Sequence, residues 1–187
     1  MDDEATIAEY LRTREPELFR VLVERHQGRV FRLVASMLGP QADLDAQEVT
    51  QEVFLRVHEK LESFRGEARF GSWLYRLAYN RAVEHRRRAR IRLPHVPVEA
   101  VPEAAAVAAD PFDEVAEGER RRVVARLVER LPDLYRSVIY MHYWLECSVQ
   151  EMAETLGVPS GTVKSYLSRA RQRLRDWAKA DGTEWLE

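Results

Sequence analysis

Cysteine, glycine and alternating strand patterns are all scarce in this chain of 187 residues, and each scarcity excludes a class of protein. The single cysteine, Cys147, excludes an internal disulfide and fits a reducing compartment. Only eight glycines are present, and no segment alternates apolar and polar residues as a half-buried strand would. No apolar run could span a bilayer, and the acidic start, MDDEATIAEY, lacks the basic region of a signal peptide. We therefore expect a soluble, all-α, cytoplasmic protein without membrane insertion.

Catalytic and metal-binding motifs are missing as well. The sequence contains no glycine-rich phosphate loop, no nucleophile motif and no convergent pair of acids. Its five histidines are scattered, and His142 lies five positions from Cys147, which is poor helical spacing for a shared metal. We expect no catalytic residue, no metal site and no cofactor, and we interpret the chain as a binding protein rather than an enzyme.

Charge is unevenly distributed along the chain, although the formal net charge is only −2. Residues 1–92 carry 17 basic and 15 acidic side chains, whereas residues 93–118 carry six acids and no Lys or Arg. Residues 119–187 carry 12 basic and 10 acidic side chains. Two slightly basic parts therefore flank an acidic segment, and each part can bind phosphates although the whole chain is weakly acidic.

The helical spacing of apolar residues predicts a string of helices on both sides of that acidic segment. The expected helices cover about 7–11, 16–38, 43–61, 72–90, 119–130 and 132–144. Asp43 or Asp45 is a candidate N-cap for the third helix and Ser72 for the fourth, after an irregular loop. Residues 93–118 hold four of the eight prolines and few large apolar side chains. We predict two small helical domains, 1–92 and 119–180, joined by a flexible acidic linker.

The stretch Ser148–Lys179 has the spacing of a helix-turn-helix. Small Ala153 lets two helices approach closely, and Gly157 can adopt the left-handed conformation that ends the first helix. Val163 then anchors the second helix, Ser160–Lys179, whose many Lys and Arg side chains suit a major groove and its phosphates. An amphipathic helix with a solvated basic face is the alternative interpretation.

Three segments, in this order, resemble the extracytoplasmic-function sigma factors of bacterial RNA polymerase. They are Asp45–Val57, Phe64–Asn80 with the arginine run that follows it, and Leu131–Arg136 leading into Gly161–Arg171. The resemblance implies a subunit that binds the β′ and β subunits of core polymerase and recognises the −10 and −35 promoter elements. It also implies a stress- or signal-responsive regulon and regulation by an anti-sigma factor.

The resemblance assigns core-polymerase binding to the third predicted helix of the first domain. The assigned residues are Asp45, Glu48, Gln51 and Glu52. Glu48 and Glu52 lie one helical turn apart, so they can pair with basic side chains of a partner helix. A solvated acidic face is the alternative. Gln47 stands where relatives commonly have an acid, and Glu48 where Asp is common.

The second segment corresponds to the part that opens the −10 element. That task needs a basic surface for the DNA backbone, aromatic faces for displaced bases and a group that reads a base edge. The expected DNA-binding residues are Arg65, Arg69, Ser72, Trp73, Arg76, Asn80 and Arg81. Among the aromatic side chains of this segment, we expect Phe64, Phe70 and Tyr75 to belong to the core.

The third segment corresponds to the domain that binds the −35 element. The expected contacts are Ser160, Thr162, Lys164, Ser165, Arg169 and Arg171. The first five are candidates for base edges, and Arg171 is a candidate for a phosphate contact. Tyr166 stands where relatives often have Arg, which removes one positive charge.

Two other functions remain as alternatives. A stand-alone, dimeric helix-turn-helix regulator would bind a palindromic site, but it leaves the motifs of the first domain unexplained. A nuclease would use Asp43, Asp45, Glu48 and Glu52 to hold a metal, although no basic residue is placed for phosphate cleavage.

Overall fold

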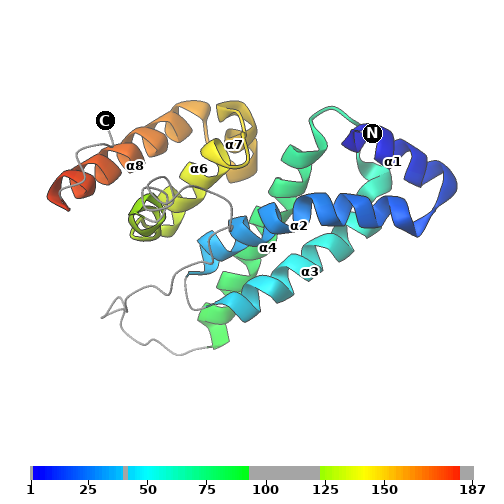
Figure 1. The fold of residues 1–187 in the computed structure, drawn as a ribbon, viewed down its shortest axis with the longest axis horizontal. Coiled ribbons are helices and arrows are strands. Elements are labelled where there is room, and N and C mark those ends of the chain that lie inside the picture. The colour runs from blue at the N-terminus through cyan, green and yellow to red at the C-terminus, as the bar shows by residue number, and fades with distance from the viewer. Residues whose placement is uncertain (1, 40–41, 93–122, 182–187) are drawn as a thin grey trace, which may run out of the picture.

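The computed structural model describes residues 2–39, 42–92 and 123–181, and the predicted linker at 93–118 lies outside the described residues. Its elements are α1 (Asp3–Thr13), α2 (Pro16–Leu38), α3 (Asp43–Lys60), the 3-10 turn η1 (Leu61–Ser63), α4 (Phe70–Arg92), α6 (Asp133–Tyr143), α7 (Val149–Leu156) and α8 (Ser160–Ala180). Residues 123–129 are also helical. Within the described ranges there are helices and no strand, which confirms the all-α prediction (Figure 1).

Two helix starts in the first half differ from the sequence predictions. α1 begins at Asp3, four residues early, because the Asp2 carboxylate accepts a hydrogen bond from the Ala5 amide at 2.8 Å. α3 has Ala42 as its N-cap residue with no side-chain cap, so the expected capping by Asp43 or Asp45 is wrong. Asp43 and Asp45 instead lie in the first turn, where a carboxylate is favoured by the helix dipole.

The start of α4 is set by a helix distant in the sequence. α4 begins at Phe70 rather than after Ser72, and the Phe70 amide donates to the Glu4 carboxylate of α1 at 3.2 Å. The expected N-cap role of Ser72 is therefore wrong. A cap supplied by another helix leaves no mark in the local sequence, so propensity arguments miss it.

The first four helices form a bundle around α2. α2 packs against α1, α3 and α4, and Val30, Leu33 and Val34 on α2 have no exposed surface. α3 and α4 also contact each other, so the amphipathic helices enclose one apolar core. Burial of this kind supplies most of the stability of such short helices.

The predicted helix-turn-helix is confirmed. Ser148 caps α7 in a reciprocal capping box with Glu151, and Gly157 ends the helix with φ +66° in the left-handed region. Val163 on α8 is fully buried and Ala153 on α7 is almost so, which holds the two helices close together. The turn is therefore fixed by its own residues at both ends of α7.

The two halves of the chain pack directly against each other. α6 contacts α2, and α7 contacts α4 (Figure 1). Arg136 on α6 is buried; its guanidinium donates to the Ser36 carbonyl at 2.6 Å and the Glu129 carbonyl at 2.8 Å, and pairs with Asp133 at 2.7 Å. These bonds fix α6 against the C-terminal end of α2.

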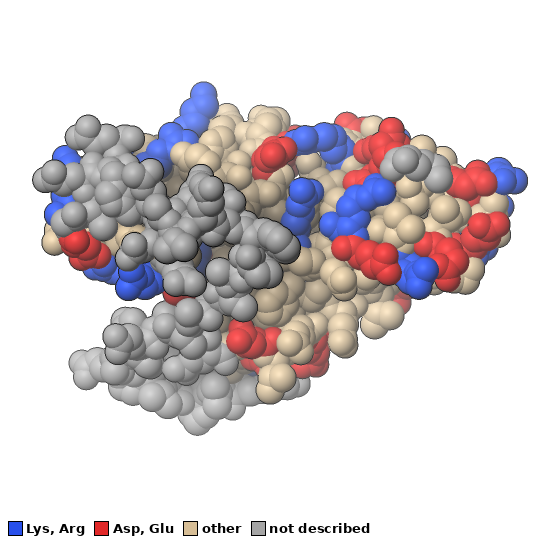
Figure 2. All heavy atoms as spheres, viewed as in Figure 1, with Lys and Arg blue, Asp and Glu red and all other residues tan. Residues whose placement is uncertain are grey.

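Surface charges of both signs are mixed in the described part of the molecule. At the end formed by α1, Lys and Arg side chains lie beside Asp and Glu side chains (Figure 2). Arg25 pairs with Asp3 there, and His26 bonds the same carboxylate at 2.8 Å. No helix among the described residues is long and apolar enough to span a membrane.

Candidate polymerase and nucleic-acid interfaces

α3 presents an exposed stripe that combines acidic, amide and apolar side chains. Glu48 and Gln51 are exposed, and Leu44 and Leu55 are 81% and 66% exposed. At about 100° per residue these four positions fall within about 60° of one another around the helix. The two leucines were not among the residues predicted from the sequence. Their positions could have revealed them, because they fall off the face that carries Val49 and the other buried residues of α3.

Asp45 and Glu52 lie on the flank of that stripe and differ in their surroundings. Asp45 is exposed, whereas Glu52 turns toward α4 and accepts a hydrogen bond from Arg81 at 2.6 Å. Arg81 also donates to Glu84 at 2.8 Å, and its side chain is only 12% exposed. Burial alone would lower the pKa of Arg81, but the hydrogen bonds to the two carboxylates raise it. Arg81 thus joins α3 to α4 and turns away from solvent, whereas the sequence predicted that it would contact DNA.

The aromatic side chains before and within α4 form a cluster that supports the loop. Phe70 and Tyr75 are buried, which confirms their predicted place in the core, and Phe64 is half-buried. The Phe64 ring lies 5.7 Å from that of Phe70 and 5.6 Å from that of Trp73. Trp73 is half-buried on these two rings, so part of its indole remains accessible.

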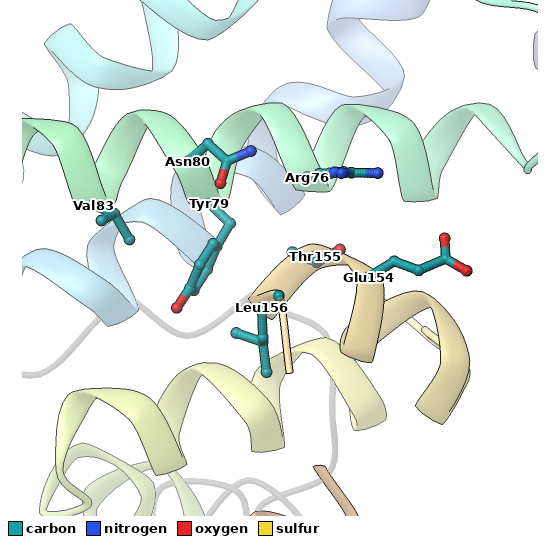
Figure 3. A pocket seen from close by; sticks show the side chains of 8 residues that line it. Arg76, Tyr79, Asn80, Val83, Glu154, Thr155 and Leu156 are labelled. Atoms are coloured by element: carbon teal, nitrogen blue, oxygen red, sulfur yellow. The ribbon is translucent and has the colours of Figure 1, made fainter. Parts of the chain in front are cut away.

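Arg76 and Asn80 are exposed one helical turn apart on α4 and face a cleft. The cleft has a volume of about 370 Å³. Its lining residues are Arg76, Tyr79, Asn80 and Val83 from α4 and Glu154, Thr155, Leu156 and Gly157 from α7 and the turn after it (Figure 3). A cationic and an amide side chain beside a tyrosine provide groups for a phosphate, a base edge and a base face.

The other residues expected at the −10 element divide between solvent and α7. Arg65 is exposed in the loop before α4. Arg69 donates to the Glu146 carbonyl at 3.1 Å and pairs with Glu151 at 3.3 Å. The Ser72 hydroxyl donates to the Glu151 carboxylate as well. The second half of the chain therefore binds two of the polar side chains that we expected to contact DNA, Arg69 and Ser72.

The arginine run at the end of α4 is partly paired. Arg86 forms an ion pair with Asp133 on α6 at 2.5 Å, and Arg88 pairs with Glu84 at 2.6 Å. Exposed pairs of this kind contribute little stability by themselves. Arg86 nevertheless adds a second polar link between the two halves.

The first turns of α8 carry an exposed polar face. Ser160, Lys164, Ser165 and Arg169 are exposed, and Thr162 is half-exposed. These residues lie at the N-terminal part of a recognition helix, the part that contacts base edges in helix-turn-helix proteins. The structure thus presents five of the six predicted −35 residues to solvent on a rigid element.

Arg171, the sixth of these residues, is held by an aromatic neighbour. Its Nε donates to the Tyr143 hydroxyl at 2.9 Å, and its guanidinium lies 5.7 Å from the centre of the Tyr143 ring. Tyr143 and Trp144 are 55% and 41% exposed, and neither was among the surface residues predicted from the sequence. Tyr143 thereby orients Arg171 from the end of α6.

Tyr166 packs rather than facing solvent. It is half-buried, and its ring lies edge-on to Tyr135 at 6.1 Å. Tyr135 in turn lies under the Arg173 guanidinium at 5.6 Å. The tyrosine that replaces a common arginine therefore joins α6 to α8 instead of contacting DNA in this arrangement.

No group of three or more His, Cys, Asp or Glu side chains within the described ranges is arranged to hold a metal ion. Cys147 is buried, and burial raises the pKa of its thiol to about 12, so the thiolate is scarce at neutral pH. This cysteine packs beside the turn before α7 as a small apolar side chain.

Comparisons with known proteins match both halves of the chain. The family described as Sigma-70 region 2 matches residues 22–91, and the family described as Sigma-70, region 4 matches residues 121–174. The chain is 30% identical over 168 residues to the ECF RNA polymerase sigma factor SigW of Bacillus subtilis strain 168, covering 86% of this chain and 89% of SigW. It is 31% identical over 175 residues to the ECF RNA polymerase sigma-E factor of Escherichia coli K12, covering 90% of each.

Two solved structures share the fold. CnrH in complex with the cytosolic domain of CnrY gives a TM-score of 0.64 at 24% identity, covering 96% of this chain and 98% of that one. The sigma factor RpoE of Bartonella quintana in complex with the anti-sigma factor NepR gives 0.68 at 21% identity, covering 87% and 98%.

Proposed function

The chain belongs to the extracytoplasmic-function sigma factors of RNA polymerase. From this premise we propose which of its surfaces bind core polymerase, the −10 element and the −35 element. As a sigma factor it acts in transcription initiation with core polymerase and promoter DNA. Residues 1–92 bind core and the −10 element, and residues 119–180 bind the −35 element. The chain supplies binding surfaces, and polymerase performs the chemistry.

The exposed stripe of α3 is the proposed docking surface for core polymerase. Glu48 and Gln51 supply polar groups, Asp45 adds charge at the flank, and Leu44 and Leu55 add apolar contact area. A stripe of this composition suits a basic, amphipathic partner helix. The exposure of the two leucines, 81% and 66%, is the observation that carries the assignment, because it places apolar contact area beside Glu48 and Gln51 on the same face of α3.

The loop before α4 and the face that carries Arg76 and Asn80 form the proposed −10 surface. Arg65, Arg69 and Arg76 hold the backbone of the displaced strand, and Trp73 and Asn80 contact bases. Ser72 lies in the first turn of α4, where its hydroxyl can reach a phosphate. The role of Arg81 is to position α4 on α3 through Glu52, rather than to contact DNA.

The N-terminal part of α8 is the proposed −35 reader. Ser160, Thr162, Lys164, Ser165 and Arg169 face base edges, and Arg171 holds a phosphate. Because α7 and α8 are joined by a fixed turn, these contacts have one geometry relative to the DNA.

Regulation by an anti-sigma factor is proposed on the similarity to CnrH and to RpoE of Bartonella quintana, which were solved with CnrY and NepR. The regulated genes are expected to respond to stress or another signal. Because polymerase and the chromosome lie in the cytoplasm, we place the protein there.

Gel filtration with bacterial RNA polymerase core tests the docking surface. The wild-type chain is expected to co-elute with core, and Glu48→Arg is expected to lose co-elution because it places a cation opposite basic partner groups. Glu24→Arg, an equal charge reversal at an exposed position of α2, is the matched control and should still co-elute. Equal co-elution of Glu48→Arg and wild type would contradict docking through α3.

A further inference from the structure

Arg171 on α8 is held in place by a neutral group, unlike several other oriented arginines of the chain. Arg69, Arg81 and Arg86 each pair with a carboxylate from another helix. Arg171 instead donates from its Nε to the Tyr143 hydroxyl at 2.9 Å, and its guanidinium lies 5.7 Å from the centre of the Tyr143 ring. It forms no ion pair with any described carboxylate. Tyr143 therefore orients Arg171 without neutralising its charge, which leaves the cation available to an anion.

Arg171 shares one face of α8 with Lys164 and Arg175, both of which are exposed. At about 100° per residue, the three side chains fall within about 40° of one another around the helix. At about 1.5 Å per residue, Arg171 lies about 10 Å and Arg175 about 16 Å along the axis from Lys164. The major groove is about 12 Å wide, so a helix that enters it at Lys164 reaches the sugar–phosphate backbone near Arg171. The position of Arg171 therefore suits a phosphate rather than a base edge.

Tyr143 is the last residue of α6, and its surroundings fix its position. Its ring is 55% exposed and lies edge-on to that of His142 at 4.8 Å. Leu145 and Cys147, in the turn that follows, are buried, so the end of α6 is anchored in the core. A phenol carries one O–H donor and two acceptor sites. The Arg171 Nε occupies one acceptor site, and no described residue accepts a hydrogen bond from the Tyr143 O–H.

We propose that Tyr143 and Arg171 together hold one phosphate of duplex DNA, so that α6 extends the −35 surface of α8. The Arg171 guanidinium supplies the charge and the donors of its two Nη groups. The Tyr143 hydroxyl accepts from Arg171 and donates its own proton to the same phosphate. Accepting a charge-assisted hydrogen bond polarises the phenol and strengthens the bond that it donates. This pairing depends on the proposed function of α8, and it adds a contact from outside that helix.

Helix packing does not explain the Tyr143 hydroxyl. α6 contacts α8, and Ile139 on α6 and Val163 on α8 are buried, whereas Tyr143 is largely exposed. Tyr135, also on α6, provides a comparison. Its ring lies under the Arg173 guanidinium at 5.6 Å, but no hydrogen bond joins its hydroxyl to Arg173. The two tyrosines thus share a stacked arginine and differ in the contact of the hydroxyl.

The expected losses of DNA affinity differ between the two side chains. Tyr143→Phe keeps the ring beneath Arg171 and removes only the hydroxyl, so duplex affinity should fall about threefold to tenfold. Arg171→Gln removes the charge, so affinity should fall about tenfold or more, and the slope of log affinity against log salt should become shallower by about 0.9. Arg171→Lys keeps the charge but loses the planar fork, so it should weaken binding while the slope stays as in wild type.

Fluorescence anisotropy of the full-length chain with a labelled duplex of about 20 base pairs, between about 50 and 200 mM salt, measures these losses. The probe need not contain the promoter, because phosphate contacts are independent of sequence. In a double-mutant cycle, Tyr143→Phe should have little further effect once Arg171 is replaced by Gln. Tyr135→Phe removes a hydroxyl from beneath Arg173 and is the matched control, which should bind within about twofold of wild type.

The proposal fails if Tyr143→Phe binds the duplex as tightly as wild type, or if its effect is the same with and without Arg171. An unchanged salt slope in Arg171→Gln would also overturn it, because no phosphate would then meet this side chain. Urea melts separate a lost contact from lost folding, and Tyr143→Phe should unfold as wild type does because Tyr143 is largely exposed. A wild-type chain that fails to bind duplex even at about 50 mM salt would instead contradict the proposed −35 surface.

Discussion

Gly157, the first residue of the turn in the helix-turn-helix, offers a prediction that separates backbone strain from steric clash. Its φ is +66°, and a Cβ built there would meet no atom within 4 Å. The cost of Gly157→Ala is therefore conformational alone. A left-handed L-residue costs about 1–2 kcal/mol, and the reduced entropy of the unfolded chain returns about 0.4–1 kcal/mol. We expect a net loss of about 1 kcal/mol in the free energy of unfolding.

Gly161, four residues later, is the internal control. It lies in the first turn of α8 with no positive φ, and its Cβ would also meet no atom within 4 Å. Gly161→Ala should therefore leave stability unchanged or raise it by up to about 1 kcal/mol. Denaturant unfolding of both variants, followed by circular dichroism, measures the difference. A Gly157→Ala variant as stable as Gly161→Ala would refute the assignment of Gly157 as a conformational requirement of the turn.

Three further predictions concern polar contacts. Arg81→Ala should lower the free energy of unfolding by about 1–3 kcal/mol in urea melts, because it leaves the Glu52 and Glu84 carboxylates of α3 and α4 without their shared cation; a loss within error of zero would show that solvent replaces the arginine. Ser148→Ala should cost about 1 kcal/mol in the same melts, because the α7 capping box loses its hydroxyl; wild-type stability would contradict the cap. Because the folded pKa of Glu151 is lowered, its stabilisation is complete above about pH 4.5 and is lost as the pH falls toward 2, so the stability difference between wild type and Glu151→Gln should shrink over that range. A difference that stays constant from pH 6 to about pH 2 would contradict the lowered pKa.

Local patterns were sufficient for much of the fold. α2 has the predicted bounds, Pro16–Leu38, because its start and its stop at Gly39 are both encoded within the segment. The helix-turn-helix likewise follows from Gly157 and the apolar spacing around Val163. The start of α4 was wrong because its cap comes from Glu4, 66 residues earlier in the chain.

The candidate sites also combine residues that the sequence could place with residues whose surroundings depend on other helices. The sequence placed Glu48, Gln51, Arg76, Asn80 and Lys164 on accessible helical faces, and the structure finds all five exposed. The sequence could not show that Arg81, unlike the other arginines of α4 assigned to DNA, is held by Glu52, because Glu52 belongs to another helix. The exposure of Leu44 and Leu55 also depends on where α2 and α4 cover α3.

By itself the sequence determined the helices, the helix-turn-helix and the ordered motifs that identify the family, because each depends on residues within a turn or two of one another. The tertiary structure decided which charged side chains are free and which are paired. It placed Arg69 and Ser72 against Glu151, about 80 residues away in the chain, and it buried Arg136 between α6 and α2. The physical reason is that a charge pair across helices is set by how amphipathic faces pack, and helical periodicity defines a face without defining its partner.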